Sequence, residues 1–119
     1  MPAGRFSFPK SARLRSSAEY RRIYEEGRKF AGPLFAAFYR PAGAGKGTRV
    51  GYTVPKAIGA AVTRNRVKRR LREAVRLELA ALPPGWDIVF NPRRTVAEVE
   101  FCRLRAEVVR LFERLGVRP

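Results

Sequence analysis

The sequence predicts an α/β-type (α+β) fold, a two-layer sandwich of one small sheet with about four strands and three helices. Two observations carry this prediction. Apolar residues recur at helical spacing in three stretches, and short apolar or alternating segments lie between them. With 119 residues and 45% apolar content, the chain can form one domain with a real core. We therefore expect a single domain over 1–119, with the element order α-β-β-(β)-α-β-α.

The first helix is expected to begin at Ser16, because Ser16 and Glu19 have the spacing of a capping box. It should run to about Glu26 and end at Gly27 in the left-handed conformation that favours glycine. Residues 1–15 hold two prolines and four basic residues, which is typical of a basic N-terminal arm. The apolar side of this helix consists of Tyr20, Ile23 and Tyr24.

Strands are predicted between residues 29 and 54. In LFAAFYR, residues 34–40, alternation places Leu34, Ala36 and Phe38 on one face of a strand and the intervening residues on the other. A glycine-rich stretch connects this segment to RVGYTV at 49–54, which we expect to form the next strand, antiparallel to it. A further short strand is compatible with residues 28–31.

A long helix is predicted from about Ala60 to Leu82, ending before two prolines and a glycine. One apolar arc of this helix should face the sheet. The arc consists of Val67, Leu71, Ala74, Val75, Leu79 and Leu82.

The remaining chain predicts one strand and one helix. WDIVF at 86–90 is a short apolar strand, in which Trp86 is expected to be a core anchor. Thr95 and Glu98 have the spacing of a second capping box and predict a last helix that ends near Gly116. Cys102 lies at helical spacing with Val99, Ala106 and Val109, which predicts that its side chain is buried.

The net charge of +16 is the strongest signal for function. Self-repulsion of this size destabilises a compact domain, so we expect an anionic partner, either nucleic acid or a membrane surface. Arginine outnumbers lysine 21 to 5, and the planar guanidinium group suits phosphate contacts and base stacking. The composition therefore favours nucleic acid.

Composition also excludes most catalytic chemistry. The chain has no His and one Cys, which excludes Ser–His and Cys–His couples, imidazole-ligated zinc and an internal disulfide. We therefore expect a protein that catalyses nothing by itself and holds no cofactor or metal. The N-terminus lacks the apolar core of a secretory signal, and no apolar run approaches the ~20 residues of a membrane span. A cytoplasmic location without a membrane partner is expected.

The segment 61–72, AVTRNRVKRRLR, holds six cations and no carboxylate. A solvated surface is the ordinary explanation of charges on a helix, but a helix that needed only solubility would intersperse Glu. The unbroken positive charge favours phosphate binding, which the first-turn N–H groups would assist. Arg66 and Arg70 project from one side of the predicted helix. The opposite flank carries Arg64, Asn65, Lys68, Arg69 and Arg72.

The stretch VGYTVPKAIGAAVTRNRVKRRLREAVR, residues 50–76, closely resembles the signature of the bacterial ribonuclease P protein subunit. In that family a strand ends at a lysine, an Ile-Gly turn follows, and a helix carries an RNR-KR--RE core. The matching residues are Lys56, Ile58-Gly59, Ala61-Val62, Arg64-Asn65-Arg66, Lys68-Arg69 and Arg72-Glu73. Chain length, strand order, charge and the lack of His extend the resemblance more loosely over 13–115.

The resemblance implies a subunit that pairs with a large catalytic RNA, one protein per RNA, to remove the 5′ leader of precursor transfer RNA. In the family, the RNA and its magnesium ions perform the hydrolysis, and the protein assists binding without being catalytic. The resemblance also implies a ribosomal-protein-like fold with a left-handed β-α-β crossover. The catalytic-RNA contacts carried over to this chain are Arg64, Asn65, Arg66, Lys68, Arg69 and Arg72.

The family's second RNA surface is a cleft between the first helix and the sheet, which holds the single-stranded leader. Its matching positions here are Tyr20, Tyr24 and Phe38, and Lys56 matches a basic residue at the strand end. Aromatic rings stack on unpaired bases with little sequence preference, which suits a subunit that serves many leaders. The tyrosines fit the core face of a short helix equally well, and that alternative stays open.

Two other classes of protein share some of these features. A ribosomal or ribosome-assembly protein would explain the charge and the size, but not the RNRVKRRLRE spacing or the paired tyrosines. A cationic membrane-active protein needs a wide apolar helical face, whereas the arc of helix 60–82 is narrow and is needed by the sheet. We therefore expect a ribonuclease P protein cofactor.

Overall fold

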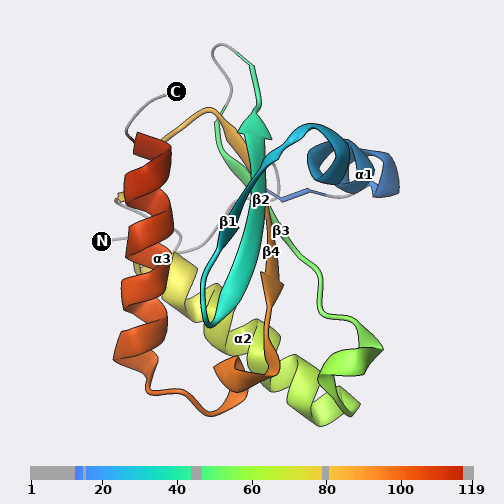
Figure 1. Cartoon of the computed structure of the whole chain (residues 1–119), viewed down its shortest axis with the longest axis vertical. Helices are drawn as coiled ribbons and strands as arrows, with labels where there is room; N and C mark the ends of the chain where they lie inside the picture. The colour runs from blue at the N-terminus through green and yellow to red at the C-terminus, as the bar shows by residue number, and fades with distance from the viewer. Residues whose placement is uncertain (1–12, 15, 44–46, 79–80, 117–119) are drawn as a thin grey trace, which may run out of the picture.

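The computed structural model describes residues 13–14, 16–43, 47–78 and 81–116 (Figure 1). The predicted arm over 1–15 lies outside these ranges except for Arg13 and Leu14. Within the described residues, three α-helices and four strands form the predicted α+β fold, with two short 3-10 helices labelled η. The elements are α1 (Ser17–Glu26), β1 (Arg28–Ala31), β2 (Phe35–Pro41), β3 (Arg49–Tyr52), η3 (Lys56–Ile58), α2 (Ala61–Leu77), β4 (Trp86–Pro92), η5 (Arg94–Ala97) and α3 (Phe101–Gly116).

The four strands form one mixed sheet in the order β1-β2-β4-β3. Strand β2 is antiparallel to β1 and to β4, whereas β3 is parallel to β4. The segments predicted at 34–40 and 49–54 thus run in opposite directions, as expected, but β4 lies between them. The unit β3-α2-β4 is a parallel crossover, and the left hand that the resemblance implies for it stays a prediction.

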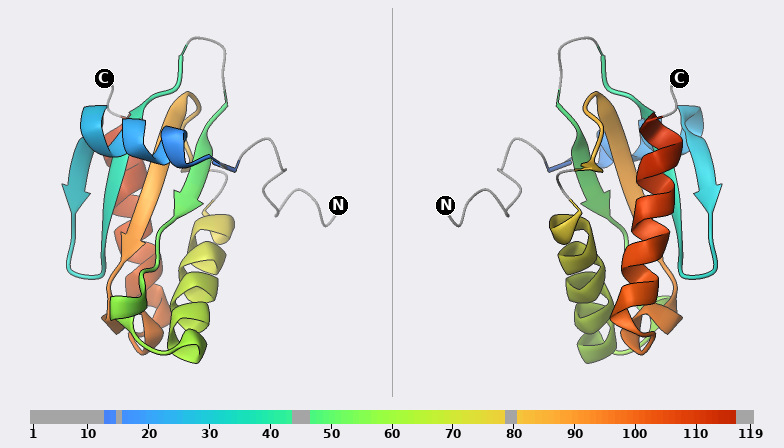
Figure 2. Two further views of the ribbon diagram at one scale, coloured as in Figure 1. Left: turned by 90° about the vertical axis from the view of Figure 1, so that its right-hand side faces the viewer. Right: turned by 90° about the vertical axis from the view of Figure 1, so that its left-hand side faces the viewer.

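Helices cover both faces of the sheet, with α1 on one side and α2 and α3 on the other (Figure 2). The alternation predicted for β2 explains this arrangement. Phe35, Ala37 and Tyr39 belong to the main core, together with buried residues of α2 and α3. Phe38 points to the opposite face, where it packs with Val89 of β4 and with residues of α1. A second, smaller core therefore forms beneath α1.

Helix α2 packs as its apolar arc predicts. Val67, Leu71, Ala74 and Val75 are buried. The helix ends at Leu77 instead of 82, because the Glu78 N–H closes the last turn on the Val75 carbonyl (3.1 Å). Of the two remaining arc positions, 82 packs partly buried against the core, and 79 lies outside the described residues.

The prediction that the last helix starts at a Thr95–Glu98 capping box is wrong, since α3 begins at Phe101. Residues 94–97 form η5, in which the Glu98 N–H bonds to the Thr95 carbonyl (3.1 Å). The burial predicted for Cys102 is also wrong, because its side chain is exposed. A longer apolar stripe on another side of the helix faces the core: Leu104, Val108, Leu111, Phe112 and Leu115.

The start of α1 follows the prediction and its end does not. The Ser16 hydroxyl accepts from the Glu19 N–H (3.1 Å), and the Glu19 carboxylate accepts from the Ser16 N–H (3.2 Å), which is a complete capping box. Gly27 has φ −84°, so it is extended and not left-handed. Glycine is needed here for another reason: a β-carbon would lie 2.8 Å from the Tyr39 carbonyl oxygen of β2.

Candidate nucleic-acid interface

One side of α2 presents an uncompensated row of positive charge, which we call the basic flank. Asn65, Lys68, Arg69 and Arg72 are exposed, and Arg64 is half-buried because its Nε donates to the Gly59 carbonyl (3.1 Å). In the described part of the chain, no carboxylate lies within ion-pair distance of these four cations. Their charge is therefore available to an external anion. The basic flank consists of Arg64, Asn65, Lys68, Arg69 and Arg72.

Arg66 and Arg70 lie on the other side of α2 and bind the chain itself. Arg66 Nε donates to the Ala97 carbonyl (2.6 Å), while the rest of its side chain stays exposed. Arg70 donates to the carbonyls of Val96 (3.0 Å) and Val99 (2.5 Å). These two arginines thus fasten the η5 segment to α2. The RNA contact expected for Arg66 stays a prediction, and part of its hydrogen-bonding capacity is already used.

The turn before α2 explains the Ile-Gly element of the sequence. Gly59 has φ +150° and ψ −167°, a region that essentially only glycine adopts. Ala60 occupies the N-cap and has no side-chain acceptor for the first-turn N–H groups. The positive end of the α2 dipole therefore adds to the field of the basic flank. Lys56 is exposed at the start of η3.

The structure brings together the three aromatic residues expected at the cleft. Tyr20, Tyr24 and Phe38 are half-buried and pack around the smaller core under α1. The rings of Tyr24 and Phe38 meet edge to face, with centroids 4.9 Å apart. Lys56 does not belong to this cluster. The partial burial fits both interpretations of the tyrosines, because each ring packs on the sheet and keeps some accessible surface.

Polar groups that sequence reasoning missed surround this aromatic cluster. The Tyr24 hydroxyl lies 2.9 Å from both Thr53 Oγ1 and Asn91 Oδ1, so it donates to Asn91 and accepts from the Thr53 hydroxyl. Lys29 lies opposite Phe38 in the β1–β2 register, with its Nζ 5.6 Å from the ring centroid. Only the strand register reveals these neighbours, because they are far apart in the sequence.

Tyr20 reaches away from Phe38 toward strand β3. Its ring covers Gly51, where any β-carbon would collide with it. Burial raises the pKa of the Tyr20 hydroxyl, and a hydrogen bond with the Tyr52 backbone partly opposes this effect. Tyr20 therefore connects α1 to the edge strand β3, while Tyr24 and Phe38 form an aromatic pair beneath α1.

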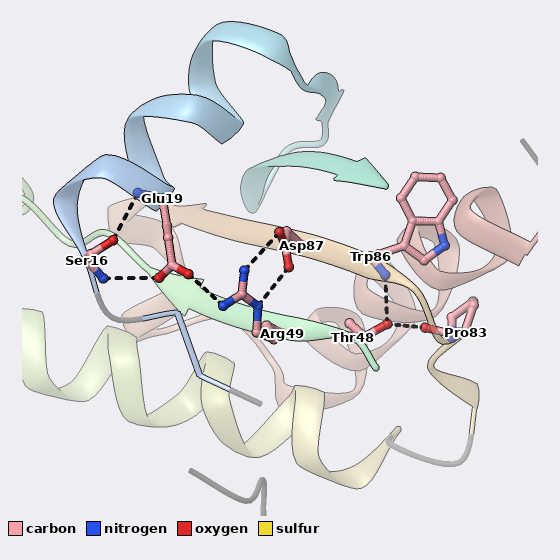
Figure 3. Close-up of polar contacts among 7 residues, drawn as sticks. All are labelled: Ser16, Glu19, Thr48, Arg49, Pro83, Trp86 and Asp87. Atoms are coloured by element: carbon pink, nitrogen blue, oxygen red, sulfur yellow. Dashed lines mark hydrogen bonds and ion pairs between the residues drawn. The ribbon is translucent and has the colours of Figure 1, made fainter. Parts of the chain in front are cut away.

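An arginine-centred network fixes α1 above the sheet (Figure 3). Arg49 of β3 forms two bonds with the buried Asp87 of β4, from Nε to Oδ1 (3.1 Å) and from Nη2 to Oδ2 (3.2 Å). Its Nη1 also donates to Glu19 (2.6 Å), the same residue that completes the α1 capping box. The Asp87 carboxylate raises the pKa of Arg49. The network sets the position of α1 and hence of its tyrosines.

Two further expectations concern metals and membranes. The described ranges contain no cluster of three or more His, Cys, Asp or Glu side chains arranged to hold a metal ion. Within the same ranges, no helix combines the length and apolar character that a membrane crossing requires.

Comparison with known proteins gives consistent results. The model of the family described as Ribonuclease P matches residues 8–116. A ribonuclease P protein component from Roseiflexus sp. (strain RS-1) is 42% identical over 106 residues, covering 88% of this chain and 86% of the relative. The solved structure of the ribonuclease P protein from Thermotoga maritima is 31% identical, with a TM-score of 0.77 and coverage of 87% of this chain and 96% of that chain. The protein from Staphylococcus aureus, at 24% identity and a TM-score of 0.76 over 91% of this chain and 98% of that chain, supports the fold.

Proposed function

This chain belongs to the family of ribonuclease P protein components, and from that premise we propose that it binds two RNAs in the assembled enzyme. One is the catalytic RNA of ribonuclease P, and the other is the 5′ leader of precursor transfer RNA. The protein would thereby assist the RNA-catalysed, magnesium-dependent removal of the leader. It would do so as one protein per RNA, in the cytoplasm.

The basic flank of α2 supports the contact with the catalytic RNA, and it is the observation that carries the proposal. Lys68, Arg69 and Arg72 are exposed and have no carboxylate partner among the described residues. An RNA backbone supplies the missing negative charge, and release of its counterions drives association. The uncapped first turn of α2 adds N–H donors at the Arg64 end of the basic flank.

The aromatic cluster under α1 supports the contact with the leader. Tyr24 and Phe38 present ring surface, and Lys29 places a cation beside Phe38 at the edge of the cluster. This combination of ring and cation suits an unpaired strand, whose bases stack while its phosphates bind the amine. Tyr20 lies at the boundary of this cluster with β3, and Lys56, which lies outside the cluster, is proposed as a separate contact with the leader.

The protein has no part in the chemical step under this proposal. It contains no His, and the described residues hold no group of side chains suited to a metal ion. The magnesium ions belong to the RNA-containing enzyme. The protein alone should therefore leave precursor transfer RNA intact, and cleavage should require the catalytic RNA.

Reconstitution with the catalytic RNA tests the first contact. We expect the triple variant Lys68→Ala/Arg69→Ala/Arg72→Ala to bind the catalytic RNA more weakly, with a salt slope lower by about 0.7–0.9 for each phosphate that the variant no longer neutralises. The matched control is Arg94→Ala/Arg103→Ala/Arg110→Ala, which removes the same charge at exposed positions outside α2. Equal affinity of the two variants would show that the basic flank is not the RNA surface.

A ring deletion tests the second contact. Phe38→Leu keeps an apolar side chain over Val89 but removes the aromatic face. Since one stacked base is worth roughly 1–3 kcal/mol, affinity for precursor should fall by about 5- to 150-fold, with little change for mature transfer RNA. Phe30→Leu, a ring deletion in the main core, is the control. Equal losses for precursor and mature transfer RNA would assign Phe38 to the core only.

A further inference from the structure

A cavity of about 350 Å³ lies at one edge of the sheet, beside β3. Its wall on the sheet side is formed by Val50, Gly51 and Tyr52, with Tyr20 of α1 above Gly51. Helix α2 contributes Lys68, Arg72 and Arg76 to the opposite wall. Strand β3 is an outer strand of the sheet, and of the described residues only segment 13–14 bridges to its outward edge, at Val50.

Arg13 closes the cavity from a third direction and is held there by its backbone. The segment 13–14 pairs with β3 through a parallel bridge between Arg13 and Val50 and a bond from the Leu14 N–H to the Val50 carbonyl (3.1 Å). Leu14 is buried in the smaller core, while the Arg13 side chain remains exposed. The Arg13 backbone is therefore fixed beside the cavity, and its side chain is one of those that line it.

The charged side chains that line this cavity are all cations: Arg13, Lys68, Arg72 and Arg76. Arg76 forms an ion pair with Glu73, whereas Lys68 and Arg72 have no such partner in the described part of the chain. These groups are hydrogen-bond donors without acceptor capacity. Because these cations repel one another around the cavity, they favour a ligand that is negatively charged and rich in hydrogen-bond acceptors.

A hydroxyl without a partner lies in the same wall. Tyr52 Oη is buried, and the described residues provide no hydrogen-bond partner for it. The Arg72 guanidinium lies over the Tyr52 ring, 5.9 Å from its centroid. Because this oxygen is buried, it offers no surface to a ligand, and the cations of the wall are the groups that a ligand would meet.

We propose that this cavity binds one phosphate group of an RNA strand, with Arg13 and Arg76 as contacts additional to the basic flank. The inference rests on the proposed function, since it takes RNA as the partner. A volume of about 350 Å³ is near the lower end of the range of small-ligand pockets, which suits one phosphate with its attached sugar.

The position of the cavity relates the two RNA surfaces to each other. Lys68 and Arg72 belong to the basic flank, and Tyr20 belongs to the aromatic cluster under α1. The cavity lies where these two surfaces meet. The bound phosphate can come from the catalytic RNA or from the leader, and the same cations serve either source.

A small anion tests the site directly in the full chain. Inorganic pyrophosphate is titrated at constant ionic strength, and the amide signals of Gly51 and Tyr52 are followed by NMR. We expect saturable shifts at these two residues, abolished in Arg13→Ala, retained in Arg103→Ala and restored in Arg13→Lys. Shifts that grow linearly over all basic segments, or that are identical in Arg13→Ala and the wild type, would overturn the proposal.

RNA binding then identifies the source of the phosphate. If it belongs to the catalytic RNA, Arg13→Ala weakens binding of that RNA by roughly five- to tenfold relative to Arg103→Ala and lowers the salt slope by about 0.7–0.9. If it belongs to the leader, the same loss occurs for precursor and not for mature transfer RNA in the reconstituted enzyme. Equal affinities of Arg13→Ala and Arg103→Ala in both measurements would overturn the inference.

The failure of this inference differs from the failure of the proposed function. If Lys68→Ala/Arg69→Ala/Arg72→Ala loses catalytic-RNA affinity while Arg13→Ala behaves as Arg103→Ala, the basic flank stands and the phosphate site is wrong. If the triple variant also keeps full affinity, the proposed function of α2 is wrong as well.

Discussion

Tyr20 of α1 and Gly51 of β3 are in direct contact, the ring of the tyrosine lying over the backbone of the glycine. A β-carbon at position 51 would stand 2.6 Å from Tyr20 Cζ and 3.0 Å from Cε2. The glycine is needed for this close approach. Its absence of a side chain allows α1 to reach the edge strand of the sheet.

Gly51→Ala should therefore displace Tyr20 without unfolding the protein, because the end of a tyrosine side chain can rotate away. We expect a loss of about 1 kcal/mol in the free energy of unfolding, at the low end for overpacking, and weaker binding of precursor relative to mature transfer RNA. Urea denaturation and binding assays measure the two effects. Gly47→Ala, where a β-carbon would meet nothing within 4 Å, is the control. Identical behaviour of the two variants would contradict the close contact.

Tyr24→Phe removes a hydroxyl that bonds both Thr53 and Asn91 while keeping the ring edge against Phe38. We expect the free energy of unfolding to fall by about 0.5–1.5 kcal/mol, because Asn91 loses its donor in a partly buried site. Chemical denaturation measures the loss. An unchanged stability would mean that water replaces the phenol at no cost.

Tyr52→Phe also removes a tyrosine hydroxyl, but unlike Tyr24→Phe it should not lower the free energy of unfolding at neutral pH. Tyr52 Oη has no partner in the described residues, so its removal should leave the free energy of unfolding unchanged or raise it by up to about 1–3 kcal/mol. Chemical denaturation at pH 7 checks this. A clear destabilisation would contradict the orphan state of this hydroxyl.

The same substitution should change the alkaline limit of stability. Burial raises the pKa of Tyr52, since the phenolate would have to form inside the core wall. Above the unfolded-state pKa of about 10, Tyr52 loses its proton in the unfolded chain but keeps it in the folded protein. Ionisation of this phenol therefore does not affect the free energy of unfolding below that pH and lowers it progressively above. Tyr52→Phe should lose less stability than the wild type between about pH 10 and 11. Parallel curves for the two proteins would exclude Tyr52 as the cause.

Arg49→Met tests the network under α1. It leaves the Asp87 carboxylate, only 5% exposed, without its bidentate partner. We expect a loss of about 2–3 kcal/mol, below the 3–5 kcal/mol of a fully buried pair because Arg49 is itself 33% exposed. Arg105→Met, which breaks a more exposed pair with Glu78, should cost less than about 1 kcal/mol. Similar losses for the two variants would show that the Arg49 network is only a surface ion pair.

Local patterns predicted the helices and strands well where one pattern dominated. The Ser16–Glu19 box located the start of α1, and the apolar arc of α2 identified its buried residues. Thr95 and Glu98 have the same spacing as the first box, but the segment they start is anchored by Arg66 and Arg70 as a 3-10 turn. A tertiary contact thus overrode a local signal, and α3 begins later.

The sequence predicted which types of residue form the candidate site, but not which of them become neighbours in space. The basic flank follows from helical spacing within one segment. The strand register decides which residues surround the aromatic cluster, namely Lys29, Thr53 and Asn91. The cavity exists because β3 lies at the edge of the sheet. Because β4 inserts between β2 and β3, no pattern within a single segment shows which residues become neighbours.

That insertion also determines when the protein can fold during synthesis. Strand β4 is the last strand to leave the ribosome, yet it is the one that joins the β1–β2 hairpin to β3. A nascent chain that ends before Trp86 can form the hairpin, but β3 and the basic helix that follows it have no sheet to pack on. Contacts between such distant segments slow folding, so completion of the sheet and packing of α2 wait for the second half of the chain.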